Sequence, residues 1–371
     1  MSIITTAVTT AITTTAESMA VSPVAAVFSK ILYIVIPILI FGLLIFIHEG
    51  GHFLAARLCK ITVNECSIGM GPKLISRTSK KSGTKYSLRA LPIGGYVSMD
   101  GENDESENPN AFCNKSVLKR VLVVVAGAFM NLLLGFIIMT VIVFAQKTLL
   151  STRIGEFNEN SLSQEKLMVN DVVLKVDGTR VHTGNELLYE IMNKGDRPID
   201  IVVLRDGEKV TVEDVVFVNE TDMGVVFGVI DFKVYQDTQT FGNYLKHAFF
   251  RSCSTVKMIY DSLYNLLTGK YGIDTVSGPI GVTEAVGTAA KSGPLNLFFF
   301  VSYISINLGV FNLLPFPALD GGRLIFLIIE GIRRKPVDRR IEGYVNFVGI
   351  MILFTFMAYV SFKDVIKLFF R

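Results

Sequence analysis

The sequence predicts an α-helical multi-pass membrane protein with one small soluble α+β domain. Half of its 371 residues are hydrophobic, and the mean hydropathy is +0.47. Soluble domains are rarely so apolar. The charged residues gather in a few stretches and leave others almost uncharged, as expected of membrane spans joined by soluble segments. The net charge of +3 is too small to indicate a nucleic-acid partner.

Four apolar runs approach the length of about 20 residues that crosses a bilayer. The first follows Lys30 and ends near Arg57, and the others cover residues 121–145, 295–314 and 344–362. We therefore predict four transmembrane helices, two in a first membrane part (residues 31–150) and two in a second (residues 295–371). A Thr/Ala-rich extension, residues 1–30, precedes them.

The basic residues predict the orientation of the spans. Residues 57–120 are rich in Lys and Arg, and residues 333–340 read RRKPVDRR. Short loops rich in these residues stay in the cytoplasm. The N-terminus, residues 147–294 and the C-terminus are then extracytoplasmic.

The soluble domain is predicted for residues 151–230. DVVLKVDGTRV indicates two strands joined at Asp177-Gly178, and GNELLYEIMNK indicates an amphipathic helix. A hairpin around Asp206-Gly207 follows. Residues 231–294 form an amphipathic segment that includes a candidate interfacial helix.

The first span ends in a metal-binding pattern, HEGGH, residues 48–52. His48 and His52 are four residues apart, so they share one face of a helix and both imidazoles can reach one ion. H-E-x-x-H on a helix is the zinc hydrolase pattern, in which the glutamate, here Glu49, acts as general base without being a ligand. Ionisable groups inside an apolar segment are costly and therefore indicate function.

A catalytic zinc needs a third protein ligand. Asp320 follows the third span on the same predicted side, just after Pro315 and Pro317, which break the helix. An ordinary loop aspartate before a Gly-Gly turn is the alternative, but a site with two histidines favours the ligand role. His182 and His247 lie in the extracytoplasmic region, so we interpret them as surface or core histidines. The four cysteines are scattered and indicate free thiols.

Several longer motifs accompany HEGGH, namely SIGMGPKL (67–74), LPIGGYVSMDGE (91–102), AGAFMN (126–131), SGPIGV (277–282) and NLLPFPALDGG (312–322). Together they resemble the site-2 protease family (M50) of intramembrane zinc metalloproteases, closest to its bacterial RseP branch. The resemblance covers nearly the whole chain from residue 31. It implies a cytoplasmic-side membrane-associated β-hairpin region after the first span, and one extracytoplasmic PDZ domain.

The resemblance implies an intramembrane metalloendopeptidase (EC 3.4.24.-) with Zn²⁺ as cofactor. Its partners would be the lipid bilayer and single-span membrane proteins, such as trimmed anti-sigma factors or signal-peptide remnants. It implies a bacterial plasma membrane, with the active site toward the cytoplasm. It also suggests that Asn312 and Asn307 contact the substrate, although Asn307 equally fits a hydrogen bond between helices.

A transmembrane substrate must unwind before it is cut, and an added β-strand would hold it extended. KYSLRALPIGGYVSM, residues 85–99, is the candidate edge, with Leu88, Gly94 and Gly95 as substrate-binding residues. A metal transporter is an alternative, but it needs ionisable groups in several spans, and the second and fourth carry almost none. A catalytically inactive PDZ-bearing adaptor would lack an intact metal motif.

Overall fold

The computed structural model describes residues 23–102, 104–222, 225–270, 272 and 276–369. The chain divides into two compact units. Of the described residues, one unit contains those between 139 and 272, and the other contains those between 23 and 138 together with 276–369. Of the predicted extension, residues 1–22 lie outside the described residues, and the first helix already begins at Pro23.

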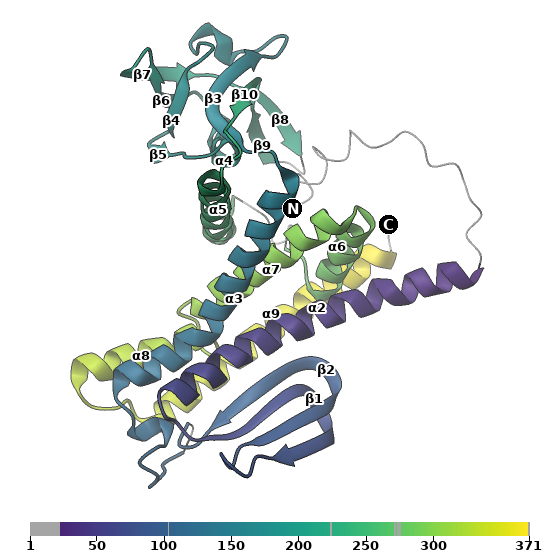
Figure 1. Ribbon diagram of the computed structural model, residues 1–371, viewed down its shortest axis with the longest axis vertical. Helices are drawn as coiled ribbons and strands as arrows, with labels where there is room; N and C mark the ends of the chain where they lie inside the picture. The colour runs from purple at the N-terminus through teal and green to yellow at the C-terminus, as the bar shows by residue number, and fades with distance from the viewer. Residues whose placement is uncertain (1–22, 103, 223–224, 271, 273–275, 370–371) are drawn as a thin grey trace. The chain divides into compact units, whose positions relative to one another are not determined.

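Among the described residues, four helices are long and apolar enough to cross a membrane. They are α2 (Pro23–Leu58), α3 (Val117–Gln146), α7 (Pro294–Leu313) and α9 (Arg339–Phe369) (Figure 1). Each coincides with one predicted span, so the prediction of four helices with the length and apolar composition of membrane spans is confirmed. The side of the membrane on which their ends lie stays a prediction.

Small residues bring α3 and α7 close together. A methyl group on Gly135 would lie 2.4 Å from Ile306, and one on Gly309 would lie 2.9 Å from the carbonyl oxygen of Ala128. Ser302 donates a hydrogen bond to the backbone oxygen of Gly135 at 2.8 Å. Membrane helices associate through such close packing and buried hydroxyl bonds, because lipid gives no hydrophobic drive.

The predicted hairpin region is a bent sheet of β1 (Val63–Thr78) and β2 (Lys85–Met99), which lies beside α2 (Figure 1). Residues 65–68 pair with 95–98 on one side and with 85–88 on the other. Residues 75–78 pair with the other edge of 85–88. Residues 95–99 therefore lie at one edge of the sheet, whereas Leu88 lies inside it.

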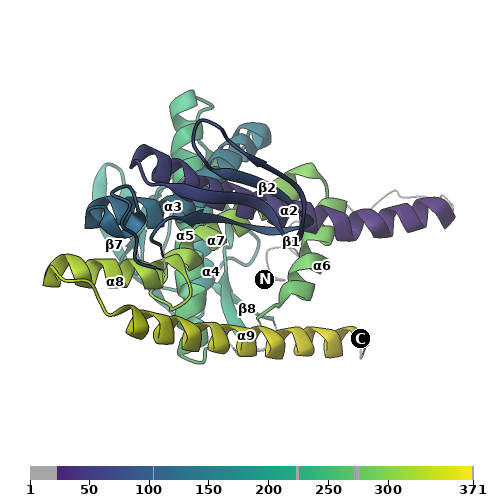
Figure 2. The ribbon, with the colours of Figure 1, turned by 90° about the horizontal axis from the view of Figure 1, so that it is seen from below.

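Two shorter helices complete the unit that contains α2, α7 and α9. They are α6 (Pro279–Lys291) and α8 (Asp320–Arg333). Figure 2 shows α6 between α2 and the C-terminal part of α9, and α6 contacts both helices. The Asp364 carboxylate of α9 accepts hydrogen bonds from the backbone N–H groups of Gly278 and Gly281, at 2.9 and 3.0 Å. It therefore caps the N-terminus of α6 from a neighbouring helix.

The other unit contains a sheet of strand order β10-β3-β4-β6-β7, with β5 paired to β4. Its strands are β3 (Leu150–Phe157), β4 (Val172–Val176), β5 (Thr179–Arg180), β6 (Ile199–Arg205), β7 (Glu208–Val215) and β10 (Phe232–Gln236). The predicted turns are present, since Gly178 and Gly207 adopt positive φ values of 80° and 88°. The sheet extends beyond the predicted boundary at residue 230, because β10 pairs with β3. A separate hairpin, β8 (Val218–Asp222) and β9 (Val225–Val229), precedes β10.

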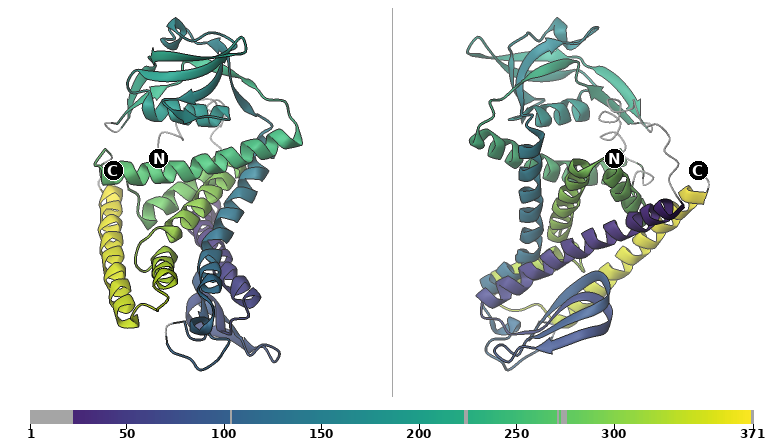
Figure 3. Two further views of the ribbon diagram at one scale, coloured as in Figure 1. Left: turned by 90° about the vertical axis from the view of Figure 1, so that its left-hand side faces the viewer. Right: turned by 45° about the vertical axis from the view of Figure 1, so that its right-hand side comes forward.

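The helix α4 (Gly184–Lys194) has the bounds that the sequence predicts. Thr183 and Glu186 form a capping box at its start, and Leu187 and Ile191 are fully buried in the core of the sheet. Figure 3 shows α5 (Phe241–Leu267) alongside α4. Lys257 of α5 donates to Glu190 of α4 at 2.6 Å.

The candidate interfacial helix within residues 231–294 corresponds to α5, and its interfacial role stays a prediction. One face exposes large apolar side chains, those of Phe241, Leu245, Phe249, Tyr260 and Leu267. The two histidines of this unit have structural surroundings, as predicted. His182 stacks on Phe250, whereas the buried His247 contacts Asp237 at 2.9 Å.

Candidate metal centre

The two histidines of the HEGGH motif point their Nε2 atoms at each other. His48 and His52 lie one turn apart on α2, and their Nε2 atoms are 3.1 Å apart. Their rings meet edge to face, with centroids 4.8 Å apart. Both residues are largely buried, so two ring nitrogens converge in a space with little water.

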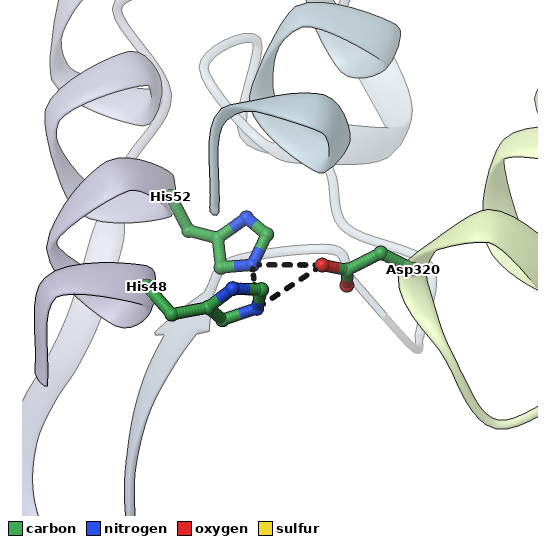
Figure 4. Close-up of side chains that lie close together, drawn as sticks. All are labelled: His48, His52 and Asp320. Atoms are coloured by element: carbon green, nitrogen blue, oxygen red, sulfur yellow. Dashed lines mark hydrogen bonds and ion pairs between the residues drawn. The ribbon is translucent and has the colours of Figure 1, made fainter. Parts of the chain in front are cut away.

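Asp320 brings a carboxylate oxygen to the same point (Figure 4). Its Oδ2 lies 3.1 Å from Nε2 of His48 and 3.3 Å from Nε2 of His52. The three atoms form a triangle with sides of 3.1 to 3.3 Å. Ligand atoms of a tetrahedral zinc lie about 3.3 Å apart when the bonds are about 2.0–2.1 Å long. The triangle therefore has the size of one face of such a site.

The surroundings of the Asp320 carboxyl group are those expected beside a bound cation. Its Oδ2 is buried and makes no well-aligned hydrogen bond to the described residues, although two imidazoles face it. Burial raises the pKa of this carboxyl group, but the two histidines outweigh it and hold the pKa below its usual range. The carboxylate is the form of this side chain that binds zinc. Among the described residues, these three form the one group of His, Cys, Asp and Glu with metal-binding geometry.

A kinked segment carries the chain from α7 to Asp320, the first residue of α8. Ala318 adopts a positive φ of 75°, and its N–H donates to the side chain of Asn346 on α9 at 3.2 Å. Any side chain on Gly321 would meet the backbone oxygen of Leu314 at 2.1 Å. The glycine after Asp320 thus lets the start of α8 fold tightly against the end of α7.

Two ion pairs fix α8 at both ends. Near its start, Arg323 donates to Glu102 at 2.5 Å and again to the Glu102 backbone oxygen at 2.8 Å. Near its end, Glu330 accepts a bidentate contact from Arg120 of α3, one bond of which is 2.9 Å long. Because Asp320 is part of this helix, both pairs determine where its carboxylate points.

The helix α3 supports the histidines from behind. His52 Nδ1 lies 2.8 Å from the backbone oxygen of Val123, and His48 Nδ1 lies 3.2 Å from the side-chain amide of Asn131. A methyl group on Gly127 would lie 2.3 Å from Nε2 of His52. The sequence reasoning missed these three residues as parts of the site. The signal was the AGAFMN motif, which contains Gly127 and Asn131.

Glu49 lies beside the triangle but does not belong to it. Its carboxylate receives a hydrogen bond from the backbone N–H of Val97. Gly95, in the same edge segment of β2, would put a methyl group 3.6 Å from Cγ of Glu49. The predicted general base and the edge of the sheet are therefore neighbours.

The predicted substrate-binding residues fall into three groups. Gly95 lies in the edge segment of residues 95–99, next to Gly94, whose φ is 87°. Leu88 lies inside the sheet, where it pairs with Ile68 and Ile75, so no further strand can bind along its backbone. Asn312 lies in the last turn of α7, and Asn307 hydrogen-bonds Tyr303 one turn earlier on that helix.

Known proteins are similar to this chain over most of its length. The family model described as peptidase family M50 matches residues 36–356. The chain belongs to this family. A protein of Clostridium acetobutylicum named as a candidate zinc metalloprotease is 37% identical over 90% of this chain and 97% of its own length.

Two further relatives of family M50 carry the name RasP. The regulator of sigma-W protease RasP of Bacillus subtilis is 29% identical and the zinc metalloprotease RasP of Shouchella clausii is 30% identical. Each alignment covers 90% of this chain and 98% of the relative. The chain is thus a zinc metalloprotease of the M50 type, and Zn²⁺ is its cofactor, in agreement with the size and chemistry of the ligand triangle.

Proposed function

We propose that this M50 metalloprotease is an intramembrane endopeptidase that cleaves transmembrane segments of single-span proteins. The observation that carries the proposal is the position of the ligand triangle. Two of its members, His48 and His52, lie on a helix that is apolar enough to span a bilayer. A hydrolytic site at that depth suits a peptide bond that itself lies in the membrane.

His48, His52 and Asp320 would hold the ion, and Glu49 would move the protons. Bound Zn²⁺ supplies a Lewis acid that polarises the scissile carbonyl and acidifies the attacking water. The Glu49 carboxylate accepts the proton of that water and then donates it to the leaving amine nitrogen. The N–H of Val97 holds this carboxylate at the edge of the sheet.

The substrate would bind as an additional strand along residues 95–99. In this edge segment the N–H of Met99 points outward to Glu102 at 3.1 Å, and the N–H of Val97 points to Glu49. Outward groups recur at every second residue of a strand, so Gly95 is next in the series. An unwound substrate bound there lies next to Glu49. Asn312 is a candidate for contact with the substrate backbone near the ion.

Substrate choice would depend on the second unit. We assign residues 150–236 to a PDZ domain that lies outside the plasma membrane, with the metal centre toward the cytoplasm. The B. subtilis relative is named as a regulator of sigma-W, which suggests trimmed anti-sigma factors as substrates. Labelling intact cells with an impermeant maleimide tests the topology. A variant that keeps only Cys253 should react, and one that keeps only Cys113 should not.

The function is tested by turnover of a single-span substrate in detergent beside zinc content. Glu49→Gln should abolish cleavage and keep one zinc per chain, because the residue moves protons without binding the ion. His52→Ala should lose both zinc and cleavage. Undiminished turnover by Glu49→Gln would refute its role as the base.

A further inference from the structure

Asn131 is a fully buried polar residue in the middle of an apolar helix. Its Nδ2 lies 3.2 Å from Nδ1 of His48, and its Oδ1 has no hydrogen-bond partner among the described residues. Burying an amide oxygen without a hydrogen-bond partner is costly. Its burial against a metal ligand therefore needs an explanation.

The tautomer of His48 supplies one. Nε2 of His48 is the atom that faces Asp320 and His52, so a metal ion would take its lone pair. The ring hydrogen is then on Nδ1, which must donate a hydrogen bond. An amide NH₂ group facing that atom would bring two donors together. Rotating the amide by 180° exchanges its nearly indistinguishable oxygen and nitrogen and gives Nδ1 an acceptor.

The rotation breaks no other hydrogen bond that the structure describes for this side chain. In the orientation drawn, the outer amide atom, Oδ1, has no hydrogen-bond partner among the described residues, so the rotation gives up no bond there. We propose that Asn131 is a positioning residue whose side-chain carbonyl accepts the hydrogen of His48 Nδ1 and keeps Nε2 directed at the ion. Acceptors behind metal-binding histidines fix the tautomer and the ring orientation in this way.

The same helix, α3, also places an acceptor beside Nδ1 of His52. The backbone oxygen of Val123 lies 2.8 Å from Nδ1 of His52, about two turns before Asn131 on α3. The backbone of Asn131 is itself held by α7, because Ser305 donates to its carbonyl oxygen at 2.7 Å. One helix thus provides an acceptor for each histidine, and a second helix holds the acceptor of His48 in position.

The test is zinc affinity, measured without substrate by competition with a chromophoric chelator. Asn131→Leu keeps the volume but removes the acceptor, and it should weaken zinc binding about 10- to 100-fold. Asn131→Asp offers only acceptors and should bind zinc at least as tightly as the wild type. Ser302→Ala is the matched control. It removes another buried hydrogen bond to α3, and it should leave zinc affinity unchanged.

The inference rests on the zinc site of the proposed function. The measurements distinguish a failure of the inference from a failure of the proposed function. Wild-type affinity in Asn131→Leu, or equal losses in Asn131→Leu and Ser302→Ala, would overturn the positioning role. If Asn131→Leu does not fold, Asn131→Asp decides, because weakened zinc binding by this variant means that Asn131 is not an acceptor. The spectrum of Co²⁺-substituted Asn131→Asp should match that of the wild type. A wild-type chain that binds zinc but cleaves no membrane substrate leaves the inference intact and refutes only the proposed function.

Discussion

Gly127 of α3 lies against His52 of α2 so closely that a methyl group on it would be 2.3 Å from Nε2 and 2.7 Å from Cε1. The same methyl group would be 2.8 Å from Cε1 of His48. Neither ring can move away freely, because Val123 and Asn131 contact their Nδ1 atoms. The absence of a side chain at Gly127 is therefore a condition for the ligand geometry.

We expect Gly127→Ala to lose most of its zinc while the helices remain inserted. The added methyl group must displace at least one imidazole, and a displaced ligand cannot complete the triangle. Zinc per chain by atomic absorption measures the effect. Gly50→Ala is the control, since a methyl group there meets nothing within 4 Å. Equal zinc content in Gly127→Ala and the wild type would contradict this prediction.

The sequence predicted the parts of the site that depend on local spacing. His48, His52 and Glu49 follow from four-residue periodicity on one helix, and Asp320 from two prolines before a Gly-Gly pair. The bounds of α4 follow from its amphipathic pattern, and the capping box of Thr183 and Glu186 marks its start. These features need only a few neighbouring residues, which is why they can be read without a structure.

Contacts between distant segments could not be predicted in the same way. Gly127 and Asn131 acquire their roles from the close approach of α3 to α2. No pattern in a short stretch of sequence predicts that two helices approach so closely. The edge of the sheet depends on the double pairing of residues 65–68. For this reason Leu88 lies inside the sheet and Gly95 at its edge, although both belong to the same predicted strand segment.

The ion pair of Arg323 and Glu102 should affect zinc binding at a distance. Arg323→Ala frees the first turns of α8, so Asp320 is held less firmly and zinc affinity should fall several-fold. Glu102→Ala should have a similar effect, and the double variant should lose little more than either single variant. The test is a double-mutant cycle on zinc affinity. Additive losses would mean that the two side chains act independently.

The hairpin sheet should weaken in acid because of Glu65. Burial raises the pKa of this carboxyl group, but hydrogen bonds from Ser87, Tyr96 and Lys73 lower it from 4.5 to about 2. A depressed pKa stabilises the fold above the unfolded value and stops doing so as the pH falls through the folded value. The melting temperature of the wild type should thus exceed that of Glu65→Gln at pH 6, with the difference shrinking from about pH 4.5 toward pH 2. A difference independent of pH would contradict this assignment.

Asp364 should be needed for the start of α6. Its carboxylate is the acceptor for two backbone N–H groups, those of Gly278 and Gly281. Asp364→Ala leaves both donors without this partner and should destabilise the first turn by about 1–2 kcal/mol. Hydrogen exchange at residues 278–282 measures the effect. Asp364→Asn keeps one oxygen that can accept both bonds but loses the charge, so these N–H groups should exchange at an intermediate rate. Protection equal to the wild type in both variants would exclude the capping role.

The way in which the substrate is held should affect the cleavage rates of modified substrates. If it binds as a strand along residues 95–99, only every second residue of the substrate donates its N–H to this edge. Methylation of such a nitrogen removes the donor and adds bulk, whereas methylation of its neighbours affects groups that point away. Single-span peptides methylated at one backbone nitrogen at a time should therefore be cleaved at rates that alternate with a period of two around the scissile bond. Each peptide serves as the matched control for its neighbour, and the enzyme, with its zinc content, is the same in every assay. Rates that fall at every position, or at none, would show that the substrate is not an added strand at this edge. The kinked segment from Asn312 to Pro317 would then be the next candidate for holding the unwound chain.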